Sequence, residues 1–185
     1  MRYASIALLL LIPSVAFAEA GAQDLRTFSL TVSPIHLAMP VLEAMGELRL
    51  GEDTGIAGIV GFGTFTVEDS VTEDKDTFDV IEVGGQINFY VLGDFDDGLH
   101  LGAEAMYLKL SGGEGDISGI ADGLALGPYL GYKTTMDIGF TFVGQLGSQY
   151  VVAAAEAKDD SSGDEAKASD SSWIVLLNLN VGWSL

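Results

Sequence analysis

The amino-acid sequence predicts an all-β protein, an eight-stranded antiparallel up-and-down transmembrane β-barrel. The clearest signal lies in residues 173–185, which alternate between a wholly apolar face and a face dominated by small and polar side chains. Trp173 and Trp183 share the apolar face and lie ten residues apart. At about 3.3 Å per residue and a strand tilt of about 40°, this spacing projects to roughly 25 Å, the height of a lipid-facing band between two aromatic girdles.

Seven further alternating segments precede this one, and turn-rich breaks separate them. We expect the strands near residues 25–33, 41–50, 55–67, 78–91, 99–110, 122–134, 137–154 and 173–185. The short breaks are residues 51–54, 92–98 and 133–137. The longer and strongly polar breaks are residues 68–77, 111–121 and 155–172. Short periplasmic turns that alternate with longer external loops are typical of outer-membrane barrels.

The two faces of the strands differ in the bulk of their side chains. Phe140 and Tyr150 repeat the ten-residue aromatic spacing on the apolar parity of their strand, so we predict an aromatic girdle of Phe140, Tyr150, Trp173 and Trp183. The other parity is rich in Gly, Gln, Asn and Ser, which suits the narrow interior of an eight-stranded barrel. A soluble lipocalin-like barrel would instead carry Lys, Glu and Thr on its solvated face.

Residues 1–18 have the pattern of a signal peptide. Arg2 precedes an apolar run over residues 6–12, and Ala16-Phe17-Ala18 is an A-x-A cleavage pattern. This run is too short for a membrane-spanning helix. The mature chain is then residues 19–185, a single barrel domain. Because cleavage removes one basic residue and no acidic one, the formal charge changes from −19 to −20.

Composition excludes several classes of function. With 27 acidic residues against 8 basic ones, the chain repels nucleic acid, and we expect no nucleic-acid partner. The absence of cysteine excludes a disulfide framework and thiolate metal sites. We expect no cofactor.

Several ionisable residues lie on the polar parity and form a predicted lumen network. They are Glu43, Glu47, Arg49, Glu82, Glu104 and Lys133, with His100 beside them. A buried unpaired charge costs several kcal/mol, so these groups imply ion pairs, hydrogen bonds or protonation. We interpret them as a plug, because an eight-stranded lumen is just wide enough for side chains to fill it. The alternative is a path for protons or small ions.

The sequence offers only weak signals for a catalytic site or a metal site. Some outer-membrane barrels are lipid-modifying enzymes with a Ser, a His and an orienting acid. Here His36 lies near Ser33 and could approach Glu43, whereas His100 has no neighbouring serine. Acidic groups within residues 68–76 and 156–170 could hold Ca²⁺ or Mg²⁺ and bridge to lipopolysaccharide phosphates, but no spacing matches an EF-hand loop. We therefore expect no catalytic residue and no metal site.

The chain ends in the alternating series Leu177, Leu179, Val181, Trp183 and Leu185. With this series it resembles a small outer-membrane β-barrel of the OmpA/OmpX-like kind. Residues 90–95, 127–133 and 177–183 are also similar to segments of uncharacterised myxobacterial barrels. The resemblance implies the outer membrane of a Gram-negative bacterium, contact with its lipid and lipopolysaccharide, and a last strand read by the barrel assembly machinery. That signal usually ends in Phe, and here it ends in Leu185.

The resemblance implies no particular activity, and the chain lacks the separate peptidoglycan-binding domain of full-length OmpA. We therefore expect a non-enzymatic integral outer-membrane barrel with a largely plugged polar lumen and a structural or surface-interaction role in the envelope. A narrow pore for ions or small solutes and a lipid-modifying enzyme are the alternatives.

Overall fold

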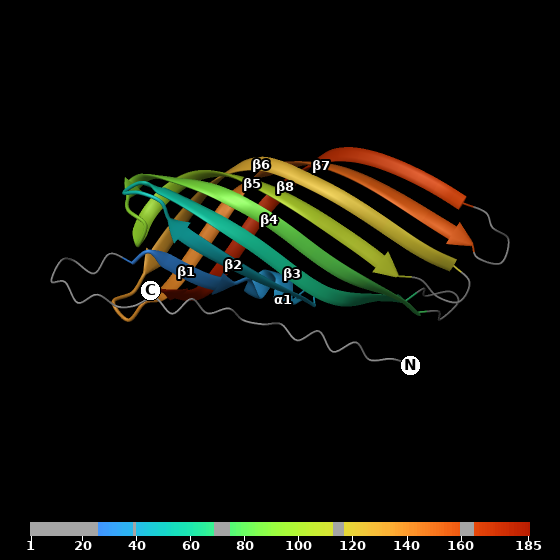
Figure 1. Ribbon diagram of the computed structural model, residues 1–185, viewed down its shortest axis with the longest axis horizontal. Helices are drawn as coiled ribbons and strands as arrows, with labels where there is room; N and C mark the ends of the chain where they lie inside the picture. The colour runs from blue at the N-terminus through green and yellow to red at the C-terminus, as the bar shows by residue number, and fades with distance from the viewer. Residues whose placement is uncertain (1–25, 39, 69–74, 113–116, 160–164) are drawn as a thin grey trace.

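The computed structural model describes residues 26–38, 40–68, 75–112, 117–159 and 165–185. Within these residues, eight antiparallel strands form a closed barrel in sequence order, with β8 pairing back onto β1 (Figure 1). The elements are β1 (Phe28–Val32), α1 (Pro34–Ala38), β2 (Val41–Arg49), β3 (Thr54–Glu68), β4 (Lys75–Gly93), β5 (Asp97–Gly112), β6 (Ile117–Thr135), β7 (Phe140–Asp159) and β8 (Glu165–Ser184). The predicted eight-stranded up-and-down barrel is confirmed.

Within the polar breaks expected at residues 68–77, 111–121 and 155–172, all the residues that the structure describes belong to strands. For example, β7 continues to Asp159 and β8 begins at Glu165, and across this extension Lys167 donates to Glu156 at 2.8 Å. The sequence pattern fails here because alternation marks a strand only where its two faces meet different surroundings. A backbone ladder with water on both sides needs no apolar face. The seventh strand also begins later than expected, at Phe140, after a turn in which Gly139 has a φ of 89°.

One side of the barrel is much shorter than the rest. β1 has 5 residues and β2 has 9, whereas β7 and β8 have 20 each. β1 pairs with β8 only from Ser29↔Ser184 to Val32↔Val181. As far as the structure describes it, β8 before Val181 therefore has no strand partner on this side. α1 packs against β2 and β8, and Figure 1 shows the long strands continuing past it.

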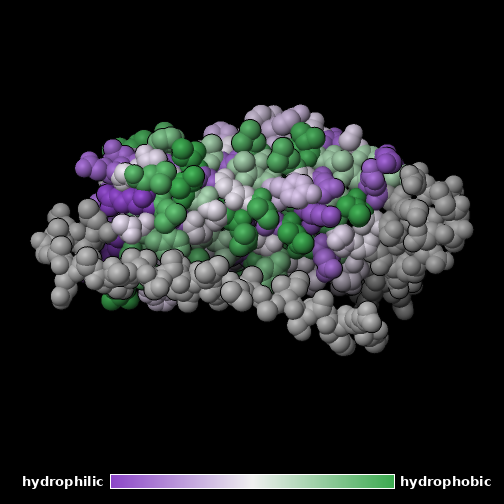
Figure 2. All heavy atoms as spheres, viewed as in Figure 1, coloured by the Kyte–Doolittle hydropathy of each residue, from purple (hydrophilic) through white to green (hydrophobic). Residues whose placement is uncertain are grey.

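The distribution of side chains is inverted relative to a soluble protein. Leu177 and Leu179 on the outer face are 53% and 49% exposed, while Gln145 and Asn180 on the inner face are buried. Figure 2 shows hydrophobic residues spread over the visible outer face. No helix within the described ranges is long and apolar enough to cross a membrane.

The four predicted girdle residues form two pairs on the outer face of β7 and β8. The rings of Phe140 and Trp183 lie 4.9 Å apart between centroids, and those of Tyr150 and Trp173 lie 5.4 Å apart. The register of the two strands places each pair directly opposite. The aromatic residues thus mark two levels, ten residues apart along each strand.

Candidate functional site

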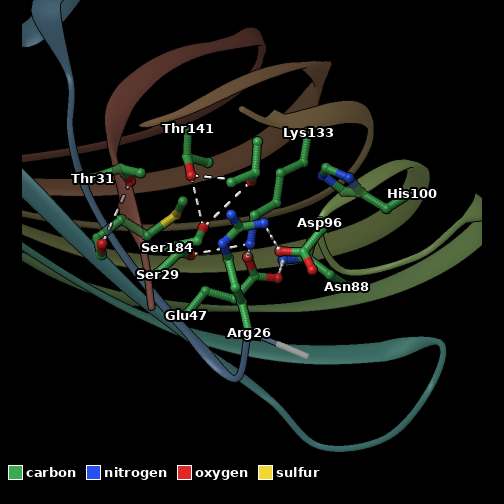
Figure 3. A network of polar contacts seen from close by, with 12 residues as sticks. Arg26, Ser29, Thr31, Glu47, Asn88, Asp96, His100, Lys133, Thr141 and Ser184 are labelled. Carbon is green, nitrogen blue, oxygen red and sulfur yellow. Dashed lines mark hydrogen bonds and ion pairs between the residues drawn. The ribbon is translucent and has the colours of Figure 1, made fainter. Parts of the chain in front are cut away.

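The lumen is the candidate site, and we call the end with the short turns after β2, β4 and β6 its base. Near the base, Lys133 of β6 is 0% exposed. Its Nζ donates to Glu47 Oε2 at 2.9 Å and to Ser29 Oγ at 3.1 Å (Figure 3). The same Nζ lies 3.4 Å from the centre of the Phe95 ring. A buried ammonium group requires such partners, and here it has an ion pair, a hydrogen bond and a cation–π contact.

The partners of Lys133 are themselves held by buried groups. Glu47 Oε1 accepts from Asn88 Nδ2 at 2.7 Å and from the Tyr90 hydroxyl at 2.8 Å. The Tyr129 hydroxyl donates to Asn88 Oδ1, and the His100 ring packs between Tyr90 and Tyr129. We call these residues, all buried, the basal cluster: Glu47, Asn88, Tyr90, Phe95, His100, Tyr129 and Lys133.

Arg26 covers the outer side of this cluster. Its guanidinium donates to the carbonyl oxygens of Met136 and Asp137 and lies 3.6 Å from Asp96 Oδ1 (Figure 3). Burial raises the pKa of Asp96 in the β4–β5 turn, and Arg26 offsets part of this rise. The side chain of Arg26 thus links the β4–β5 turn to the β6–β7 turn at the base of the barrel.

The middle of the lumen holds a carboxylate among amides. Glu104 accepts from Gln86, from Gln149 at 2.6 Å and from Asn178 at 3.2 Å. Gln145 then joins Gln86 and Asn178 in the same group. Donors from three other strands therefore take the place of water around this single buried charge.

A third group lies beside α1, and we call His36, Glu43 and Glu82 the acidic cluster. His36 Nδ1 is 3.5 Å from Glu43 Oε1 and 2.8 Å from Ser33 Oγ. One ligand atom from each of the three residues lies within 4.8 Å of the others. Glu82 Oε2 is buried without a hydrogen-bond partner. Burial lowers the pKa of His36, and Glu104 opposes that effect.

Beyond the acidic cluster the lumen opens into a cavity of about 500 Å³. Polar residues line the end nearest the base: His36, Glu43, Glu82, Glu104, Gln149 and Asn178. The rest of the wall is mainly apolar, and it includes Met106, Leu108, Leu110, Val151, Ile174 and Leu176. The inner face is therefore polar over one part of the barrel and apolar over the other.

The structure divides the predicted lumen network among separate groups. Glu47 and Lys133 meet at the base, Glu104 lies among the amides, and Glu43 and Glu82 lie with His36. Arg49 is not seen to join them; its Nε donates to the Gly51 carbonyl oxygen at 2.8 Å. Sequence reasoning missed Phe95, Tyr129 and the apolar cavity. The parity of Tyr129 with Lys133 on β6 is the signal that points to its inward position.

The arrangement at His36 differs from a nucleophile–base–acid triad. In such a triad one ring nitrogen faces the serine and the other faces the acid. Here Ser33 Oγ and Glu43 Oε1 both approach Nδ1. Ser33 Oγ also lies 3.4 Å from the backbone N–H of His36, as expected for a residue that caps α1.

No known family model matches the chain, and no curated protein matches it in sequence. Among solved structures, the chain is similar to a major outer membrane protein from Thermus thermophilus, with a TM-score of 0.50 and 14% sequence identity. The similarity covers 85% of this chain and 99% of that one. At this identity the similarity shows a shared fold alone. The resemblance to OmpA/OmpX-like or myxobacterial barrels stays a prediction.

Proposed function

We propose that the protein is a non-enzymatic integral barrel of the outer membrane whose lumen is closed to through-flow by the basal cluster. Its role is structural, or is interaction at the cell surface through the long strands. Membrane lipid and lipopolysaccharide surround the apolar outer face, and the assembly machinery reads the last strand, Leu177 to Leu185. The predicted signal peptide, residues 1–18, lies outside the described residues and forms the export step of this proposal.

Membrane residence is supported by the outer face. Isolated surface hydrophobics are normal in soluble proteins, but a continuous apolar belt is not. Here most outward side chains of neighbouring strands are apolar and exposed from one aromatic level to the other, and the buried side chains include Glu, Gln, Asn and Lys. In a lipid bilayer the apolar outer face would contact acyl chains, while the polar side chains of the inner face bond to one another. The fold shared with an outer membrane protein agrees with it.

Closure of the lumen rests on one observation, the burial of the basal cluster. Lys133, His100 and Asn88 are each at most 1% exposed, so water does not reach these side chains. An ion moving along the axis would have to separate the Lys133–Glu47 pair, whose members are both buried. This geometry argues against the narrow pore. The Nδ1-only contacts of His36 argue against a Ser–His–acid enzyme.

Conductance in planar bilayers tests the proposal. The wild-type barrel, shown to be folded by a heat-dependent shift in gel mobility, should give no current steps. A Tyr129→Ala/Lys133→Ala variant, which removes two members of the basal cluster, should conduct. The matched control is Leu130→Ala/Tyr132→Ala, which truncates outward side chains of the same strand and should stay silent. Regular current steps from the wild-type barrel would contradict closure. Folding to a monomer in detergent-free buffer would contradict membrane residence.

A further inference from the structure

Two carboxylates of the acidic cluster lie together, and only one of them contacts His36. Glu43 and Glu82 face Gly61 of β3 from either side in the sheet register. A Cβ at Gly61 would lie 2.5 Å from Glu82 Oε2, so the glycine leaves the space into which this carboxylate leans. Glu43 is 3% exposed, and Glu82 Oε2 is buried without a partner. Such a pair requires a proton or a cation.

The described side chains supply little positive charge at this point. Lys133 is bound to Glu47, Arg26 and Arg49 lie at the basal turns, and Lys109 and Lys167 have the outward parity of their strands. His36 contacts Glu43 alone of the two carboxylates, at 3.5 Å. Glu104 shows the contrast, because three amides donate to it. The acidic cluster is therefore short of a cation.

The cavity next to this cluster has the character of a ligand site. Its volume of about 500 Å³ lies within the usual range for small-molecule pockets, which are mostly apolar with a few convergent polar groups. Leu108, Ile174 and Leu176 turn inward along its wall. An apolar cavity that stays dry is available to apolar ligands. An elongated apolar chain would suit this wall, and its charged end would meet the carboxylates.

The short side of the barrel provides a route from the bilayer. The β1–β8 ladder ends at Val32↔Val181, so residues 173–180 of β8 lie between the two aromatic levels with an edge that no described strand pairs. An unpaired edge at this depth is costly unless water or a polar group reaches it. A molecule with a polar head and an apolar tail could pass here. This step relies on the membrane residence proposed above, whereas the cavity and its charge do not.

We propose that the cavity binds a single-chain amphiphile with a protonated amine as its headgroup. The ammonium group lies between Glu43 and Glu82, and the tail lies along the inner faces of β5, β7 and β8. An anionic headgroup would be repelled by the same carboxylates. A divalent cation would satisfy the acidic cluster but would leave the apolar wall without an occupant.

Titration calorimetry on the folded full-length barrel in zwitterionic nanodiscs tests this, with heats from empty discs subtracted. The probes are dodecylammonium, dodecyl sulfate, dodecanol and Zn²⁺. Dodecylammonium should bind saturably at one per barrel. Glu43→Gln/Glu82→Gln should weaken it by about tenfold or more, since each charged contact is worth about one such factor. Glu156→Gln, an exposed carboxylate near the open end, is the control and should change nothing.

A cavity-filling variant tests the tail. Leu176→Trp keeps both carboxylates and should abolish dodecylammonium binding, whereas Leu179→Trp, on the outer face of the same strand and outside the cavity lining, should not. If Leu176→Trp fails to fold, Leu108→Phe narrows the same cavity. Equal affinity for dodecyl sulfate or dodecanol would overturn the proposal, as would the absence of saturable binding. Zn²⁺ binding without dodecylammonium binding would overturn it in favour of a metal site. Because conductance is measured separately, none of these results depends on whether the lumen is closed.

Discussion

Replacing Lys133 by Met tests the basal cluster, because it removes the ammonium group and keeps most of the side-chain volume. Removing one member of a buried ion pair typically costs about 3–5 kcal/mol, since the other charge is left uncompensated. Glu47 would still accept from Asn88 and Tyr90. We therefore expect the lower end, a loss of about 3 kcal/mol in the free energy of unfolding. Against a typical total of about 5–15 kcal/mol, this is a large fraction.

Urea unfolding from lipid vesicles, followed by tryptophan fluorescence, measures this loss. Glu47→Gln should cost a similar amount, because it leaves Lys133 buried and unpaired. The double variant should lie within about 1 kcal/mol of the wild type, so that the coupling energy is about 5 kcal/mol. The matched control is Lys167→Met. Lys167 also lies 2.8 Å from a carboxylate, that of Glu156, but the two side chains are 62% and 65% exposed, and the loss should be near zero.

The refuting result is specific. If Lys133→Met and Lys167→Met destabilise the barrel equally and the double-mutant cycle shows no coupling, water reaches the Lys133–Glu47 pair. The base of the lumen would then be wet, and the argument for closure would fail with it.

Three further predictions concern the outer face, the barrel wall and α1. Brominated acyl chains should quench the fluorescence of exposed Trp173 and Trp183, and quenching by aqueous acrylamide alone would contradict the girdle assignment. Gly127→Ala should lower the free energy of unfolding in urea by about 1–3 kcal/mol, because its Cβ would collide with the Ser148 carbonyl oxygen; Gly58→Ala, with nothing within 4 Å, should not. Burial lowers the pKa of His36 below 6.5, so the unfolded chain binds its proton more readily. Stability from this group is complete above pH 6.5 and declines as the pH falls below it, and His36→Gln should remove that part of the pH dependence of urea unfolding.

Alternation along single strands was enough to predict the barrel and most of its faces. Gln145 and Asn180 lie inside and Leu179 outside, as their parity indicates, because side-chain direction is a local property of a strand. Which side chains meet across the lumen, in contrast, is not a local property of one strand. Lys133 and Glu47 were both placed in the lumen, but they come from β6 and β2, and their contact depends on the registers of the strands between them.

The apolar cavity was not predicted from the sequence, for a different reason. Around Ile174 and Leu176 the outward neighbours Trp173, Val175 and Leu177 are also apolar, so the segment lacks the contrast that distinguishes the faces. The sequence pattern cannot show whether an inward apolar residue packs against another or faces open space. That depends on the width of the barrel at each level and on which strands reach it.

The unequal strand lengths explain why the two halves of the lumen differ. At the base all eight strands are present, and the ring is narrow enough for large side chains such as Tyr129 and Lys133 to fill it. Further along the axis β1 and β2 have ended, so fewer side chains point inward and space is left beside the inner faces of β5 to β8. The same shortening leaves this edge of β8 without a strand partner among the described residues, next to that space. Extending β1 into residues 33–40 would therefore close the wall and shrink the cavity together, which makes the short β1–α1–β2 side the feature that decides what this barrel can hold.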